Sequence, residues 1–79
     1  MDFEKIALEI MIEACETDEI KDDLDMDLFD AGLIDSLSTL GIIVAIEEKL
    51  NIRLQPTDFE KSDVSSVNNL KAFLEKKVT

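Results

Sequence analysis

The chain of 79 residues contains no histidine, tryptophan or tyrosine, and its only cysteine is Cys15. Without histidine, a Ser-His-Asp or Cys-His catalytic arrangement is excluded, and so is a zinc site with histidine ligands. One cysteine also excludes an internal disulfide and a four-cysteine metal cluster, and it is typical of a reducing compartment. Because Cys15 falls on the apolar side of a predicted helix, we interpret it as a small core residue.

Positive charge is scarce as well. Eight Lys and Arg stand against 19 Asp and Glu, so the formal net charge is −11 and the isoelectric point is near 4.1. A surface this negative repels the phosphates of nucleic acids and anionic lipids, and it attracts basic faces of other proteins. We therefore expect protein partners that carry Lys and Arg patches, and no binding to nucleic acid.

Long apolar runs are also lacking. The longest uncharged run, Leu37–Ile46, is about half of the roughly 20 residues that a membrane span needs. Charged Asp2, Glu4 and Lys5 stand where a signal peptide would become apolar. The sequence thus predicts a monomeric cytoplasmic protein without membrane insertion, folded as one domain over residues 1–79.

Three segments show the apolar spacing of amphipathic helices. The first has Asp2 as a suitable N-cap, the second starts at Asp35-Ser36 and stops before Asn51, and the last has Ser66 as N-cap. The residues predicted to lie on the apolar faces are Phe3, Ile6, Ala7, Leu8, Ile10, Met11 and Ala14, then Leu37, Leu40, Ile43, Val44, Ile46 and Leu50, and then Val67, Leu70, Phe73, Leu74 and Val78.

A long acidic connection, Thr17–Asp35, joins the first two helices. Gly32 is expected to take a positive φ there, just before the chain turns into the second helix. A connection of this length is usually packed by its own apolar side chains. The candidates for that packing are Leu24, Leu28, Phe29, Leu33 and Ile34.

The same connection invites comparison with a calcium-binding loop. Asp23, Asp25 and Asp27 fit its first, third and fifth positions, but Leu28 stands where glycine is needed and Ile34 where the bidentate glutamate is needed. We therefore predict a solvated acidic loop and no metal site.

The segment after the second helix is short. Ile52 and Leu54 suggest an extended stretch ending at Pro56, and Thr57–Glu60 matches a capping box that predicts a single short turn of helix. Three main helices plus one short helix make an all-α, four-helix bundle.

The second helix carries no charge from Ser36 to Ile46 and is apolar nearly all round, so it is either fully buried or used as a contact surface. Ser36 is no hydrolase nucleophile, because the G-x-S-x-G elbow and histidine are both absent. Its hydroxyl remains open to modification by another enzyme as a phosphoester. Free amides at the helix start would then face the phosphate.

The string Leu28-Phe29-Asp30-Ala31-Gly32-Leu33-Ile34-Asp35-Ser36-Leu37 resembles the attachment motif of the acyl and peptidyl carrier proteins. The similarity extends over nearly the whole chain. It implies an acyl-carrier-protein-like bundle that is not itself an enzyme, in which Ser36, beside Asp35, bears a 4′-phosphopantetheine cofactor from coenzyme A.

Within this family, two residues between Gly32 and Asp35 resemble the D-alanyl carrier proteins, whereas fatty-acid carriers commonly have one. Pro56–Phe59 also resembles the Pro-x-Thr-Glu-Phe stretch of that group, and Asn68 falls where that group has an asparagine at the start of the last helix. The chain departs from the group at Val64, where tryptophan is frequent, and at Leu37-Ser38, where Met or Phe precedes glycine. It departs from carriers generally at Gly41, which is often acidic.

The resemblance implies three partners: a Mg²⁺-dependent phosphopantetheinyl transferase, a D-alanine–carrier protein ligase that loads D-alanine as a thioester, and a membrane acyltransferase for D-alanylation of lipoteichoic acid. A carrier that must meet these enzymes in turn and leave each one is served best by weak, fast binding. The predicted docking residues are Leu37, Leu40, Val44, Glu47 and Glu48. Two alternatives stay open: a carrier for fatty-acid, polyketide or peptide synthesis, and an interaction bundle that is no carrier.

Overall fold

A computed structural model describes residues 2–55 and 58–78 of the chain. Over these residues the regular secondary structure is helical throughout, as the sequence predicts. In chain order the elements are α1 (Phe3–Cys15), the 3₁₀ turn η1 (Glu19–Asp22), α2 (Ser36–Leu50), the 3₁₀ turn η3 (Lys61–Val64) and α3 (Val67–Val78). The turn η1, inside the acidic connection, was not anticipated by the sequence patterns.

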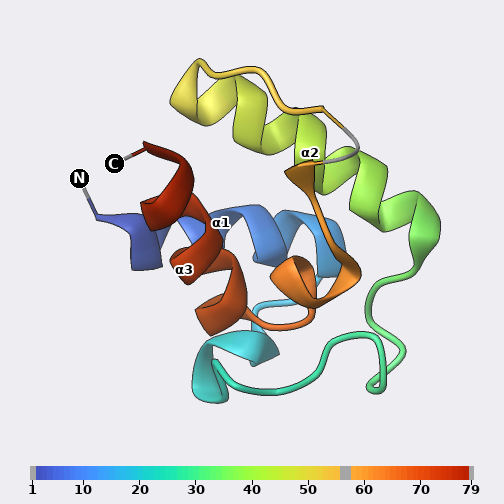
Figure 1. Cartoon of the computed structure of the whole chain (residues 1–79). Coiled ribbons are helices and arrows are strands. Elements are labelled where there is room, and N and C mark those ends of the chain that lie inside the picture. The colour runs from blue at the N-terminus through green and yellow to red at the C-terminus, as the bar shows by residue number, and fades with distance from the viewer. Residues whose placement is uncertain (1, 56–57, 79) are drawn as a thin grey trace.

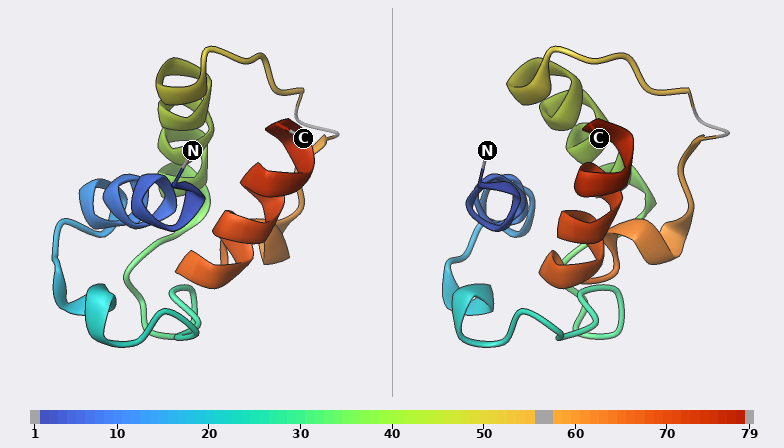
Figure 2. Two further views of the ribbon diagram at one scale, coloured as in Figure 1. Left: turned by 90° about the vertical axis from the view of Figure 1, so that its left-hand side faces the viewer. Right: turned by 60° about the vertical axis from the view of Figure 1, so that its left-hand side comes forward.

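Helix α1 is central to the arrangement, since it packs against both α2 and α3 (Figure 1). It crosses α2 steeply, and in the view along its axis α2 and α3 both lie to the same side of it (Figure 2). The acidic connection passes along one end of the molecule and rises to the start of α2. No helix in the described ranges has both the length and the apolar character that crossing a membrane requires.

The helix ends confirm the predicted caps. The Asp2 carboxylate accepts a hydrogen bond from the amide of Lys5 at 3.0 Å, and Ser66 Oγ accepts one from the amide of Asn69 at 3.1 Å. Helix α2 stops at Asn51, whose φ of 53° is the left-handed conformation expected of a stop residue. Helix α1 ends in the same way at Glu16, with φ 57°.

The apolar faces of the helices meet in one core. In α1 and α3 the buried residues are among those that the spacing predicts. In α2 the core side is formed by Ile42, which was not predicted, and Ile46, whereas the predicted Leu37, Leu40 and Val44 are exposed. Cys15 is half-buried against this core, as expected, and burial raises the pKa of its thiol. Val78 is a correction: it is 39% exposed, because it lies at the last position of α3, where little packs over it. The buried helical residues are Ala7, Ile10, Met11, Ile42, Ile46, Val67, Leu70, Phe73 and Leu74.

The acidic connection is anchored by its apolar residues, as predicted. Leu28 and Ile34 are buried, and Leu24, Phe29 and Leu33 pack partly buried against the core. A further anchor, Ile20 in η1, is completely buried. Its predecessor and successor are charged, so no periodicity marks it in the sequence.

Hydrogen bonds tie this connection to the start of α3. The amide of Leu28 donates to the carbonyl of Ser65 at 2.7 Å, and the amide of Asn68 donates to the carbonyl of Leu24 at 3.0 Å. Gly32 has the predicted positive φ, 75°. The connection is therefore a fixed part of the fold that sets where α2 begins.

The second connection, between α2 and α3, is described only in part. Leu54 is buried, and its amide donates to the Glu47 carboxylate at 2.9 Å. Pro56 and Thr57 lie outside the described residues, and so does the start of the predicted Thr57–Glu60 turn. The short helix that the structure describes is η3, Lys61–Val64. Its capping box joins Glu60 and Asp63, and Glu60 itself is extended.

Candidate functional site

Helix α2 begins at Asp35, which is its N-cap. One carboxylate oxygen of Asp35, Oδ1, accepts hydrogen bonds from the amides of Leu37 and Ser38, each at 3.0 Å. The same oxygen accepts the hydroxyl of Ser38 at 3.2 Å. The hydrogen bond from the Ser38 amide is the main reason why the pKa of Asp35 lies below its ordinary value. The carboxylate is thus held ionised against the first turn of the helix.

Three hydroxyl side chains follow Asp35 in this first turn, and they are not equivalent. The Ser38 hydroxyl bonds the Asp35 side chain, and the Thr39 hydroxyl donates to the Asp35 carbonyl at 3.1 Å. Ser36 is exposed, and over the described residues no hydrogen bond involves its hydroxyl. Ser36 is therefore the hydroxyl of the first turn that an external enzyme can reach without breaking a bond.

The structure corrects one detail of the predicted phosphate site. Free amides were expected to face a phosphate on Ser36, but those of Leu37 and Ser38 are occupied by Asp35, and that of Thr39 bonds the Asp35 carbonyl at 3.1 Å. The positive end of the helix dipole remains, but much of its hydrogen-bonding capacity is used within the helix. A phosphate on Ser36 therefore needs part of its charge compensation from elsewhere.

Ser36 opens onto a surface hollow of about 510 Å³. Segments far apart in the sequence form its wall, and the sequence patterns did not bring them together. Phe59 stands edge-on to Phe73 at 5.3 Å between ring centroids, and the ammonium of Lys61 lies 4.7 Å from the centroid of Phe29. The lining residues are Phe29, Ile34, Asp35, Ser36, Thr39, Phe59 and Lys61.

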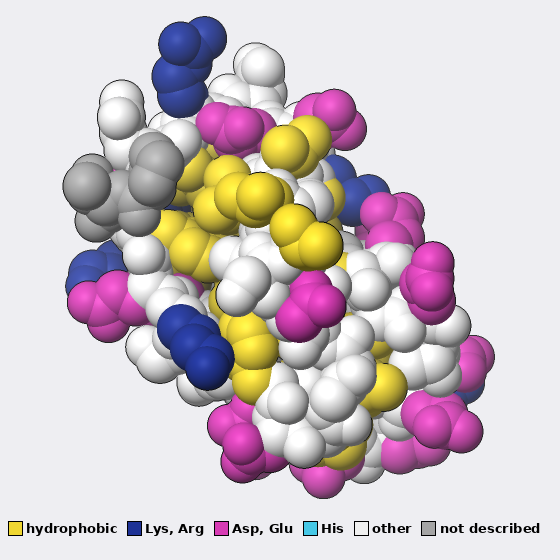
Figure 3. Space-filling view, turned by 90° about the vertical axis from the view of Figure 1, so that its right-hand side faces the viewer, with side chains coloured by type: hydrophobic (Ala, Val, Ile, Leu, Met, Phe, Trp, Pro, Cys, Tyr) yellow, Lys and Arg dark blue, Asp and Glu magenta, His cyan; other side chains and the backbone are white. Residues whose placement is uncertain are grey.

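An apolar face continues from Ser36 along α2. Leu37, Leu40 and Val44 are 78%, 62% and 51% exposed, whereas Ile42 and Ile46 of the same helix are buried. Hydrophobic side chains gather on the side of the molecule that carries the start of α2 (Figure 3). Of the two interpretations of this uncharged helix, the structure favours a contact surface on one side and core packing on the other.

Residues 6–74 match the family model described as a phosphopantetheine attachment site. The chain belongs to this family of carrier proteins. Its relatives include D-alanyl carrier proteins of Staphylococcus saprophyticus, 36% identical over 95% of this chain and 96% of the relative, and of Bacillus velezensis, 33% identical over 89% and 90%. That of Bacillus subtilis is also 33% identical over 89% of this chain and 90% of its own length.

The two predicted acidic docking residues of the carrier lie in different surroundings. Glu47 is half-buried, and one of its carboxylate oxygens is engaged by the amide of Leu54. Glu48 is exposed, and nothing described in the structure binds its side chain. Glu47 therefore has a structural role that the sequence did not reveal, whereas Glu48 is available at the surface.

Two acids of the carrier's long connection, Asp27 and Asp23, serve as local caps, and Asp25 accepts a hydrogen bond from the side chain of Asn68 at 2.6 Å. Asp27 Oδ1 accepts the amides of Phe29 and Asp30 at 3.0 and 3.1 Å, and Asp23 Oδ1 accepts the amide of Asp25 at 3.3 Å. Among the residues described, no three His, Cys, Asp or Glu side chains are grouped as a metal ion would require.

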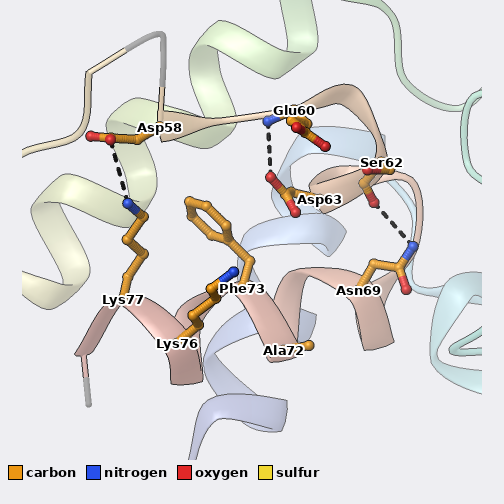
Figure 4. A pocket seen from close by; sticks show the side chains of 9 residues that line it. All are labelled: Asp58, Glu60, Ser62, Asp63, Asn69, Ala72, Phe73, Lys76 and Lys77. Carbon is orange, nitrogen blue, oxygen red and sulfur yellow. Dashed lines mark hydrogen bonds and ion pairs between the residues drawn. The ribbon is translucent and has the colours of Figure 1, made fainter.

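A second hollow of the carrier, of about 470 Å³, lies between α3 and η3 (Figure 4). Many of its polar groups bond one another: Lys77 pairs with Asp58 at 3.5 Å, and Asn69 donates to the carbonyl of Ser62 at 3.0 Å. The pKa of Asp58 is lowered, first by a hydrogen bond from the Gln55 amide and then by Lys77. We assign this hollow a structural role, because its contacts hold the segment before η3 against α3.

Proposed function

We propose that Ser36 of this carrier protein receives 4′-phosphopantetheine and that the loaded chain carries D-alanine. The observation that supports Ser36 is its exposed hydroxyl, which is free of hydrogen bonds in the described structure while those of Ser38 and Thr39 are engaged. The names of the relatives support D-alanine as the cargo.

Attachment requires an external phosphopantetheinyl transferase with Mg²⁺. The Ser36 oxygen forms a bond to the β-phosphorus of coenzyme A, and the bond from that phosphorus to the leaving 3′,5′-ADP breaks. The hydroxyl proton passes to a base of the transferase. Asp35 supports the step by fixing the helix start, so that the Ser36 side chain is presented from a rigid turn.

When bound, phosphopantetheine supplies the thiol that holds D-alanine as a thioester. The chain itself catalyses no step: it presents the cargo to a D-alanine–carrier protein ligase and then to a membrane acyltransferase that serves teichoic acid D-alanylation. We place it in the cytoplasm as a monomer whose residues 1–79 act as one carrier domain.

Docking to these enzymes uses the apolar face of Leu37, Leu40 and Val44, which begins directly beside Ser36. Glu48, and the part of Glu47 left free by Leu54, add negative charge at the far end of the same helix. The net charge of −11 steers the chain toward basic faces, and a small apolar contact keeps each encounter brief.

The test is the intact mass of the protein after incubation with coenzyme A, Mg²⁺ and a broad-specificity transferase, comparing wild type with Ser36→Ala and, as a matched control, Ser38→Ala. We expect the mass of one phosphopantetheine group, called the arm below, to be added to wild type and to Ser38→Ala, and none to be added to Ser36→Ala. The Ser36→Ala chain should stay folded by circular dichroism, with its free energy of unfolding changed by less than about 0.5 kcal/mol, because the cap comes from Asp35.

An arm on Ser36→Ala would move the attachment site elsewhere. No arm on folded wild type, with the transferase active on a control carrier, would favour an interaction bundle that is no carrier. Once the arm is attached, incubation with a D-alanine ligase and competing acyl-loading enzymes decides the cargo. Preferential loading with a fatty-acyl or other aminoacyl group would replace D-alanine by another carrier function.

A further inference from the structure

Among the residues that the structure describes, Lys61 is the only cation that lines the hollow beside Ser36. Its ammonium lies over the ring of Phe29 at 4.7 Å from the centroid, and within the described ranges no carboxylate is close enough to form an ion pair with it. Two lysines rest on aromatic rings: Lys77, over Phe73, is also paired with Asp58, whereas Lys61 has only the ring of Phe29 among its described contacts. Its charge is therefore available for an anion brought into the hollow.

A phosphodiester on Ser36 is such an anion. The amides of Leu37, Ser38 and Thr39 are already bonded to Asp35, so they do not compensate its charge. The Asp35 carboxylate adds a second negative charge at the same place. These two facts leave Lys61, which lines the same hollow, as the group that can compensate the charge.

The segment that leads to Lys61 is held in place by contacts with α3. Phe59, two residues earlier, packs edge-on against Phe73 of α3, and Asp58 pairs with Lys77 of α3 at 3.5 Å. Lys61 is itself the first residue of η3. The backbone of Lys61 is thus fixed, while its long side chain is exposed and, in the part of the chain that the structure describes, its ammonium contacts only the Phe29 ring.

We propose that Lys61 is a positioning residue for the arm: its ammonium pairs with the phosphodiester on Ser36, and the apolar pantoyl part of the arm lies against Phe29 and Phe59. This inference rests on the function proposed above. It implies that the loaded arm spends part of its time in the hollow near Lys61 rather than fully in solvent. Asp27 and Asp30, which line an adjoining hollow with Lys61, limit the strength of the contact.

The experiment follows the arm itself. The protein is loaded with phosphopantetheine, and its thiol is labelled with a nitroxide maleimide in a Cys15→Ala background, so that the arm carries the only thiol. Amide signals near the nitroxide are broadened in NMR spectra. The variants are Lys61→Gln, Lys61→Arg, and Lys76→Gln as a matched control, since Lys76 is an exposed lysine on the separate hollow of Figure 4.

We expect the nitroxide to broaden the amides of Phe29, Phe59 and Lys61 in the otherwise wild-type chain. Lys61→Gln should reduce this broadening by about two- to fivefold, the range that exposed ion pairs usually give. Lys61→Arg and Lys76→Gln should retain it. Raising the salt from about 0.1 M to about 1 M shortens the screening length from about 10 Å to about 3 Å and should have the effect of Lys61→Gln.

Spectra of the variants without an arm show whether each remains folded. Equal broadening in Lys61→Gln and the parent chain would overturn the role of Lys61, and so would an absence of broadening in the parent chain. Intact mass separates these results from failure of the proposed function: a labelled arm without the predicted broadening refutes the contact alone. A chain that accepts no arm at Ser36 refutes both.

Discussion

Truncation of Leu37 to alanine tests whether the start of α2 is the docking surface. Leu37 is 78% exposed, so a partner that covers it gains most of the free energy of burying a leucine side chain. Complete burial contributes about 1.5–3 kcal/mol. Alanine retains only Cβ, and the expected loss on docking is about 1–2 kcal/mol, which corresponds to about 5- to 30-fold.

The assay is ligase turnover with the phosphopantetheine-loaded protein at sub-saturating concentration, where the rate reports kcat/KM. We expect kcat/KM to fall by that factor while kcat at saturation stays near that of the wild type, because the lost contact is made equally before and during the reaction. The control is Val78→Ala, another exposed apolar residue, 39% exposed at the end of α3, which should leave kcat/KM unchanged.

Stability must be measured on the same variants. An exposed side chain contributes little to folding, so Leu37→Ala should change the free energy of unfolding by less than about 0.5 kcal/mol. If Leu37→Ala is as stable as the wild type and its kcat/KM is also unchanged, the reasoning is refuted and the ligase binds another face. Equal losses for Leu37→Ala and Val78→Ala would likewise show that the effect is not local.

Two further predictions concern the frame around Ser36. Leu28→Ala removes a fully buried anchor of the acidic connection and should lower the free energy of unfolding in urea by about 2–5 kcal/mol. Leu40→Ala, at the exposed face, should change it hardly at all. A small loss of stability for Leu28→Ala would mean that the connection does not depend on this anchor. Because the pKa of Asp35 is lower in the folded chain, its charge stabilises the fold above its unfolded pKa, and this contribution is lost as the pH falls through the folded value. Asp35→Asn should therefore be less stable than the wild type at neutral pH and equal to it at strongly acidic pH in unfolding experiments, and a gap that does not depend on pH would contradict this account.

Much of the fold could be predicted because its signals are local. The caps Asp2, Asp35 and Ser66, the stop at Asn51 and the positive φ of Gly32 each depend on one residue and its immediate neighbours. Side-chain oxygens that reach amides two or three positions away, and residues that tolerate a left-handed backbone, act without help from the rest of the chain.

Features that depend on distant segments were missed or misplaced. Ile20 is buried because η1 turns it toward the core. Val78 is exposed because it is the last residue of α3, where little packs over it. The short helix η3 and its capping box, which joins Glu60 to Asp63, were not anticipated by the sequence patterns.

The candidate site likewise combines features set by local sequence with features set by tertiary packing. By itself the sequence determined the helix start at Asp35-Ser36, the acidic surface and the absence of histidine chemistry, because composition and short-range hydrogen bonding are properties of the chain. Only the tertiary structure decided that the Ser36 hydroxyl is the free one and that Leu37, Leu40 and Val44 face outward. It alone brought Lys61, 25 residues after Ser36, onto the same hollow, because side chains from separate segments meet only when packing against a shared core fixes where each segment lies.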